Sequence, residues 1–155
     1  MYFKCQTFVG LAVVTVAFLT LSAQRIDRLS PDDIRSAELC LNNCFDPDAS
    51  KMKLKKWDLK ITENGFFRLR KYFPNGKQEY FSFNLHRFAS LDYMGTNRSG
   101  TLTLRTQGDD IIVQTYNDPK GNIDSMSRNL EMPLKNIEAE QLNELYSSLA
   151  SIKKK

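Results

Sequence analysis

The sequence predicts an α+β fold, an antiparallel meander sheet of about six strands with an N-terminal helix and a C-terminal helix packed on it. Three observations predict this class. Apolar residues alternate with polar ones along short segments that turn-forming residues separate. Apolar residues recur at helical spacing near both ends of the region 24–155. No internal repeat and no linker interrupts the chain after residue 50.

The composition is that of one ordinary globular domain. The chain has 155 residues, of which 41% are hydrophobic and 26% are charged, and its formal net charge is +4. Seven glycines and five prolines are too few for a collagen-like or low-complexity chain. One histidine and three cysteines leave little material for a metal site, so we expect no metal and no cofactor.

The first 23 residues have the pattern of a secretory signal peptide. Lys4 precedes the uncharged apolar run 7–21, and the small residues Ser22 and Ala23 come just before Gln24. We expect cleavage after Ala23, which leaves a single α+β domain over 24–155 that is exported, either periplasmic or secreted. The uncharged run 5–24 is also long enough to span a bilayer, so an uncleaved anchor is the alternative. The cleaved chain would have no membrane span.

Residues 31–43 are predicted as the first helix. Ser30 suits the N-cap and Pro31 the first turn, and two aspartates follow at the positive end of the helix dipole. Ile34, Ala37 and Leu41 form the apolar stripe.

Two cysteines lie one turn apart in the first helix. Cys40 and Cys44 have i,i+4 spacing, which places their Cα atoms about 6 Å apart, near the upper limit of disulfide geometry. In an exported protein this spacing leaves two interpretations open, a disulfide bridge or two free thiols. A redox-active pair is disfavoured because the spacing is not C-x-x-C.

The next segments read as strands joined by turns with a clear mechanism. Asn64-Gly65 is a strong hairpin signal, and Pro74-Asn75-Gly76 presets a second turn. Alternation and β-propensity predict strands at 56–62, 66–73, 78–85, 101–106 and 111–116, and a weaker strand at 123–132 that Leu130 and Met132 anchor. The pattern of residues 86–99 is less regular and is compatible with either a short strand at 91–93 or a loop that crosses the sheet.

The C-terminal segment is predicted as a helix that begins at an Asn136 cap. Leu142, Leu145, Leu149 and Ile152 recur along one face, and we expect them to be buried against the sheet. A strongly twisted sheet could curl into a half-barrel that this helix closes. In outline the arrangement resembles PH-like or lipocalin-like rolls, although the sequence shares no motif with them. A resemblance of fold alone does not give function.

Positive charge is concentrated in residues 51–77, which carry nine basic side chains and two acidic ones. Alternation places part of this charge on the outward face of the first hairpin, interleaved with aromatic rings. A basic, aromatic sheet face can bind polyanions. The predicted polyanion-binding face consists of Lys60, Arg68, Arg70, Phe66 and Tyr72. The simpler interpretation is a solvated face with an edge strand protected by lysine.

No catalytic motif is present. The sequence lacks G-x-S-x-G, H-E-x-x-H and a P-loop. Its one histidine, His86, comes just after a predicted strand, a position typical of surface residues. Asp118, Asn122 and Asp124 surround a glycine but lack the order of a calcium loop, so a β-turn explains them better.

We therefore expect a small exported, non-enzymatic binding or interaction domain of the cell envelope or extracellular space. Its partner would be an envelope protein or an anionic glycan or lipid surface, and we expect no nucleic acid partner. One alternative is a carrier of a small apolar ligand, motivated by Trp57, Phe67, Phe81 and Phe83. A further and weaker alternative is an envelope hydrolase.

Overall fold

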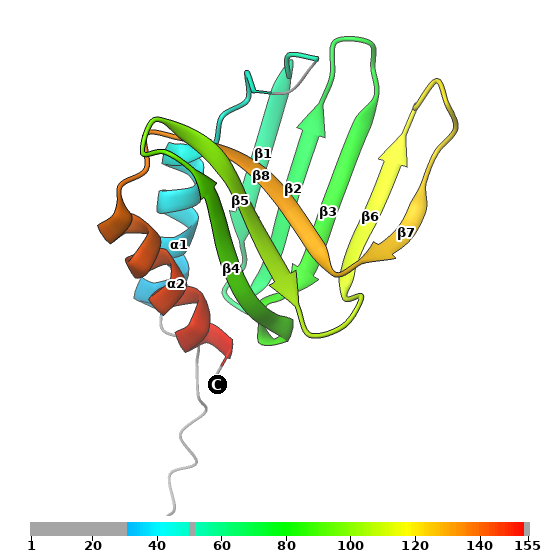
Figure 1. Cartoon of the computed structure of the whole chain (residues 1–155). Helices are drawn as coiled ribbons and strands as arrows, with labels where there is room; N and C mark the ends of the chain where they lie inside the picture. The colour runs from blue at the N-terminus through cyan, green and yellow to red at the C-terminus, as the bar shows by residue number, and fades with distance from the viewer. Residues whose placement is uncertain (1–30, 50–51, 154–155) are drawn as a thin grey trace, which may run out of the picture.

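The computed structural model describes residues 31–49 and 52–153, whose arrangement is shown in Figure 1. The predicted signal peptide at 1–23, its alternative as an anchor, and the predicted cap Ser30 lie outside these residues. The elements are, in chain order, α1 (Pro31–Cys44), β1 (Lys56–Ile61), β2 (Phe66–Tyr72), β3 (Gln78–Asn84), the single 3-10 turn η1 (Leu85–Arg87), β4 (Phe88–Gly95), β5 (Ser99–Thr106), β6 (Ile111–Tyr116), β7 (Asp124–Ser127), β8 (Asn129–Lys135) and α2 (Ala139–Lys153).

The α+β class is confirmed, with the described strands divided between two antiparallel sheets. The larger sheet has the order β1-β2-β3-β6-β7, and the smaller has the order β4-β5-β8. The sheets do not close into a barrel. In Figure 1 the three-stranded sheet crosses one end of the five-stranded sheet, and both helices lie beside it. The chain passes between the sheets at η1, at residues 107–110 and at Arg128.

Two segments differ from the sequence prediction. Residues 88–95 form the full strand β4, because Leu91 pairs with Leu104 and Tyr93 pairs with Leu102 in the second sheet. The predicted strand 123–132 is two strands, β7 and β8, in different sheets. No glycine or proline marks this break, so the sequence pattern alone does not reveal it.

The first three strands form the predicted meander, with turns of the expected chemistry. Gly65 has a φ of 70° and Gly76 a φ of 87°, a left-handed conformation that glycine adopts without steric cost. In the first turn the N–H of Gly65 donates to the carbonyl of Thr62 at 2.8 Å, and in the second the N–H of Gly76 donates to the carbonyl of Phe73 at 3.1 Å. These turns fix the register of the hairpins.

The hydrophobic core brings together one face of each sheet and one face of each helix. The rings of Phe67 and Phe83 pack within it with their centres 5.1 Å apart. The five-stranded sheet contributes Leu59, Ile61, Phe67, Leu69, Phe83 and Ile111, and the three-stranded sheet contributes Phe88, Leu102, Leu104, Leu130, Met132 and Leu134. In the described chain, the three-stranded sheet and both helices therefore cover the same face of the five-stranded sheet.

Helix α1 protects the edge of the larger sheet. The backbone N–H of Ile61 donates to Oε2 of Glu38 at 2.7 Å, and Nδ2 of Asn42 donates to the carbonyl of Leu59 at 3.2 Å. These side chains satisfy backbone groups that an edge strand otherwise leaves unpaired. Strand β1 is therefore a closed edge along this stretch.

Helix α2 packs against α1, η1 and β4. Leu145, Leu149 and Ile152 are buried as predicted, whereas Leu142 is only partly buried. The helix begins later than expected. Asn136 lies in the preceding turn with a φ of 51° and does not cap the helix.

The cap of α2 is formed at Glu138. The backbone N–H of Glu138 donates to Oε1 of Gln141 at 2.9 Å, which is one half of a capping box. Within the described part of the chain, no helix is long and apolar enough to cross a membrane.

Candidate functional site

The outer face of the five-stranded sheet points away from the core. Side chains alternate across a strand, so the outward residues are those between the buried ones. Each of them is exposed or partly exposed. The outer face consists of Lys56, Asp58, Lys60, Phe66, Arg68, Arg70, Tyr72, Gln78, Tyr80, Ser82, Asn84, Ile112, Gln114, Tyr116, Asp124 and Met126.

The structure places all five residues of the predicted polyanion-binding face together on the outer face. Lys60 lies opposite Arg68 across the β1–β2 ladder, and Phe66, Arg68, Arg70 and Tyr72 follow one another on the outward side of β2. Successive outward residues on one strand are about 6.7 Å apart. The two arginines and Lys60 therefore form a compact cationic cluster.

Three aromatic rings hold cations of this face in place. The distances from cation to ring centre are 5.3 Å for Arg68 on Phe66, 5.0 Å for Arg70 on Tyr80 and 5.8 Å for Lys56 on Tyr72. A cation within about 6 Å of an aromatic ring is attracted by the ring quadrupole. The rings thus restrict where the cations lie before any partner binds.

The same cations have no carboxylate partner among the residues that the structure describes. Within residues 31–49 and 52–153, no ion pair involves Lys56, Lys60, Arg68 or Arg70. Asp58 lies opposite Arg70 in the ladder but does not form an ion pair with it. The guanidinium donors of both arginines are consequently free to bind an oxyanion, for which their planar fork is suited.

The outer face continues over β3, β6 and β7 with aromatic and apolar side chains. Tyr80 and Tyr116 pack edge to face with ring centres 5.1 Å apart. Ile112 lies opposite Met126 in the β6–β7 ladder. Tyr116 is 43% exposed and Met126 is 55% exposed, which is high for large apolar side chains. This half of the face has no counterpart in the sequence prediction.

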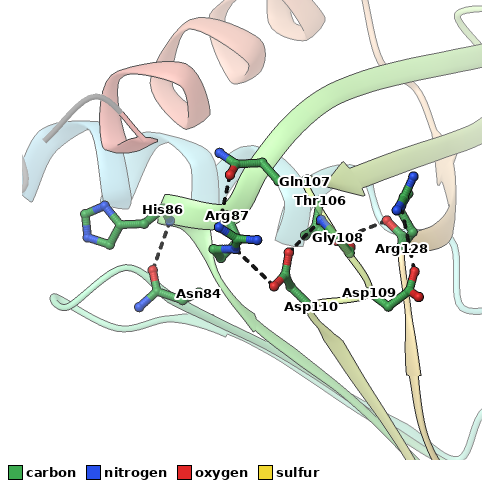
Figure 2. A network of polar contacts seen from close by, with 9 residues as sticks. All are labelled: Asn84, His86, Arg87, Thr106, Gln107, Gly108, Asp109, Asp110 and Arg128. Carbon is green, nitrogen blue, oxygen red and sulfur yellow. Dashed lines mark hydrogen bonds and ion pairs between the residues drawn. The ribbon is translucent and has the colours of Figure 1, made fainter.

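A second polar cluster, drawn in Figure 2, lies where the chain passes between the sheets. Nε of Arg87 is 3.0 Å from Oδ1 of Asp110, and the other carboxylate oxygen of Asp110 accepts from the N–H of Gly108 at 2.8 Å. Arg87 also donates to Oε1 of Gln107 at 3.0 Å. The hydrogen bond from Arg87, and next the one from Gly108, hold the pKa of Asp110 below its usual range.

The buried hydroxyl of Thr106 completes this corner network. It donates to the carbonyl of Gly108 at 2.8 Å and lies 3.2 Å from the carbonyl of Arg128. Arg128 in turn approaches Asp109, with 3.7 Å between Nε and Oδ1. The network ties together all three points at which the chain changes sheet, so its arrangement is explained by the fold.

His86 lies beside the corner network without joining it through its ring. Its backbone N–H donates to Oδ1 of Asn84 at 2.9 Å, and Figure 2 shows the imidazole pointing away from Arg87 and Asp110. The side chain is exposed, as the sequence predicted. The histidine and the nearby carboxylate therefore do not form a base and its orienting acid, which catalysis by such a pair requires.

Cys40 and Cys44 are both free thiols in the structure, on adjacent turns of α1. Burial raises the pKa of Cys40 to about 11 and also raises the pKa of Cys44. Sγ of Cys44 lies 3.9 Å from the carbonyl of Asn136. Thiols with a raised pKa are weak nucleophiles at neutral pH, which argues against a redox-active pair. The disulfide of the oxidised protein stays a prediction.

The loop of Asp118 and Asn122, whose residues loosely match a calcium loop, forms a turn that its own hydrogen bonds stabilise. The N–H of Asp118 donates to Oδ1 of Asn122 at 3.1 Å, and Gly121 has a φ of 101°. Asp118 also accepts from Nζ of Lys77 at 2.8 Å, and that hydrogen bond lowers the pKa of Asp118. Among the described residues, no group of three or more candidate ligands could hold a metal ion.

A pocket of about 150 Å³ lies at the β6–β7 end of the sheet, lined by Gln114, Thr115, Tyr116, Asn122, Ile123 and Asp124. Pockets that bind small molecules usually measure about 300–1,000 Å³. Of the aromatic residues that motivated a carrier, Phe67 and Phe83 are buried, and Trp57 and Phe81 pack against the same core. In the described chain these rings fill space rather than line a cavity.

Comparison with protein families, with curated proteins and with solved structures finds no match. Function therefore has to be inferred from the geometry of this chain.

Proposed function

We propose that this chain is an exported, non-enzymatic binding domain whose outer face binds a partner that presents an array of negatively charged groups. One observation carries the proposal. Four cations share a sheet face that no described part of the chain covers, and no carboxylate of the described residues neutralises any of them. Clustered charge of one sign attracts and orients a partner of the opposite sign.

The aromatic contacts add to this argument. A long, mobile cationic side chain loses about 0.5–1.5 kcal/mol of rotational freedom when a partner immobilises it. Arg68 and Arg70 are already restricted by the rings of Phe66 and Tyr80. Part of the entropic cost of binding is therefore met within the folded protein.

Retention on immobilised heparin, used as a soluble polyanion probe, tests the proposal. The Arg68→Gln/Arg70→Gln variant should elute at distinctly lower salt than the parent, because it lacks the central cations of the outer face. The matched control is Arg35→Gln/Arg98→Gln, which removes the same charge from exposed positions in α1 and in the β4–β5 turn. Equal elution of the two variants would show that net charge, and not this face, causes retention.

The exported location is a separate part of the proposal and has its own test. The support is the pattern of residues 1–23 in the sequence. The intact mass of the protein recovered from the cell exterior or periplasm should correspond to a chain that begins at Gln24. Full-length chain recovered only from the membrane fraction would instead indicate the uncleaved anchor.

A further inference from the structure

We infer that the anionic partner is the surface of a lipid bilayer, on which the outer face lies flat. This inference rests on the proposed function and narrows the partner to one class. It follows from how the outer face is divided, from its shape, and from the contrast with the other exposed sheet surface.

The outer face has a cationic half and an aromatic half that lie side by side. Strands β1 and β2 carry Lys56, Lys60, Arg68 and Arg70, whereas β3, β6 and β7 carry Tyr80, Ile112, Tyr116 and Met126. A soluble polyanion would use only the first half. An anionic bilayer uses both, because its headgroups attract cations and its interfacial region favours tyrosine and short apolar contacts.

The two tyrosines of the aromatic half, Tyr80 and Tyr116, combine a hydrogen-bonded hydroxyl with an accessible ring, as residues at a membrane–water interface do. The hydroxyl of Tyr80 donates to Oε1 of Gln78 at 2.8 Å, and the hydroxyl of Tyr116 donates to Oε1 of Gln114 at 3.4 Å. Their polar ends are thus partnered within the sheet while the rings remain accessible. Amphipathic rings of this kind are enriched where one end meets an apolar phase and the other meets water.

The shape of the face favours a planar partner over a polymer strand. The outward residues lie in rows across consecutive strands, such as Lys60, Arg68, Ser82, Ile112 and Met126. The pocket of about 150 Å³ lies at one end of this surface and is too small to seat a polysaccharide chain. Rows of outward side chains that run across five strands fit an extended surface such as a bilayer.

The outward face of the three-stranded sheet shows what an ordinary solvated surface of this protein looks like. There Nε of Arg105 lies 2.8 Å from Oδ2 of Asp92, so the charge is paired, and the neighbouring outward positions are Thr101, Thr103, Glu131 and Met94, which is 84% exposed. This surface also exposes a large apolar side chain, Met94, so what sets the outer face apart is that its cations have no ion-pair partner among the described residues.

Vesicle co-sedimentation measures the inference directly. The parent protein should bind vesicles that mix phosphatidylcholine with phosphatidylglycerol, should bind pure phosphatidylcholine vesicles weakly, and should lose binding as salt rises. Each lysine or arginine near an anionic membrane is worth about 1 kcal/mol, so Arg68→Gln/Arg70→Gln should weaken partitioning about 30-fold. The control Arg35→Gln/Arg98→Gln should bind like the parent, since its changes lie outside the outer face.

A second variant tests the aromatic half. Met126→Ser leaves the charge unchanged and should weaken binding to anionic vesicles while leaving retention on heparin unchanged. Circular dichroism and urea unfolding establish that each variant remains folded. Retention on heparin without binding to anionic vesicles would overturn the lipid inference and leave the polyanion function standing. Binding to neither probe would overturn both proposals. Vesicle binding that Arg68→Gln/Arg70→Gln leaves unchanged would overturn the lipid inference.

Discussion

The packing of α2 can be tested by one truncation, Leu145→Ala. Leu145 is 1% exposed and lies on the stripe by which α2 packs against α1, η1 and β4. The change removes about three buried methylene equivalents, which at about 0.8 kcal/mol each gives about 2.4 kcal/mol of lost transfer free energy. The cavity left behind adds to this, and measured Leu→Ala costs reach about 2–5 kcal/mol. We expect a loss of about 3–4 kcal/mol in the free energy of unfolding.

Urea unfolding followed by circular dichroism measures this loss. With a denaturant slope of about 2 kcal/mol per molar urea, the midpoint should fall by about 1.5–2 M. The neighbouring Glu144 is exposed, and Glu144→Ala should change stability by no more than about 0.5 kcal/mol. Equal midpoints for Leu145→Ala and the parent would refute the packing of α2. The apolar stripe of the helix would then be a surface free to bind something else.

Three further predictions concern the corner network and the cysteines. Thr106→Val leaves the partly buried carbonyl of Gly108 without its donor and should cost about 1–3 kcal/mol in urea unfolding, whereas Thr103→Val, at a half-exposed position, should change little. The pKa of Asp110 is depressed in the folded state, so the stability that its carboxylate contributes is present at neutral pH and is lost as the pH falls below about 5. Asp110→Asn should reduce this loss of stability at low pH, and a pH profile of stability identical to that of the parent would contradict the prediction. If Cys40 and Cys44 are bridged, a thiol probe should label neither in the unfolded, unreduced protein, and labelling of both would exclude the bridge.

The β1–β2–β3 meander could be predicted from the sequence because each of its determinants is local. Alternation places Leu59, Phe67 and Phe83 on one face, and the turns at Gly65 and Gly76 need only the residues within them. Local turn chemistry sets register, and register sets which side chains face the core. The cationic half of the outer face follows from the same reasoning, which is why its five predicted residues are together.

The aromatic half of the outer face could not be predicted, because it depends on strand order. On the side away from β2, strand β3 pairs with β6 and not with β4, the next strand in sequence. Tyr80 and Tyr116 therefore meet on adjacent strands, although β4 and β5 of the other sheet separate them in the sequence. No local pattern encodes that pairing. The division of 123–132 at Arg128 is hidden for the same reason, since only tertiary contacts send the polar segment β7 and the alternating segment β8 to different sheets.

The corner network and the bare outer face are two consequences of the same topology. Each time the chain leaves the five-stranded sheet it enters the second sheet, and the apolar faces of that sheet and of both helices meet one side of the larger sheet. The outer face is then free of the packing demands that fix a core residue. A solvated sheet face needs no large apolar side chains, yet Phe66, Tyr80, Tyr116 and Met126 are there. Cross-strand packing such as that of Tyr80 with Tyr116 stabilises the sheet, and the proposed binding function accounts in addition for the exposure of Met126 on the same face.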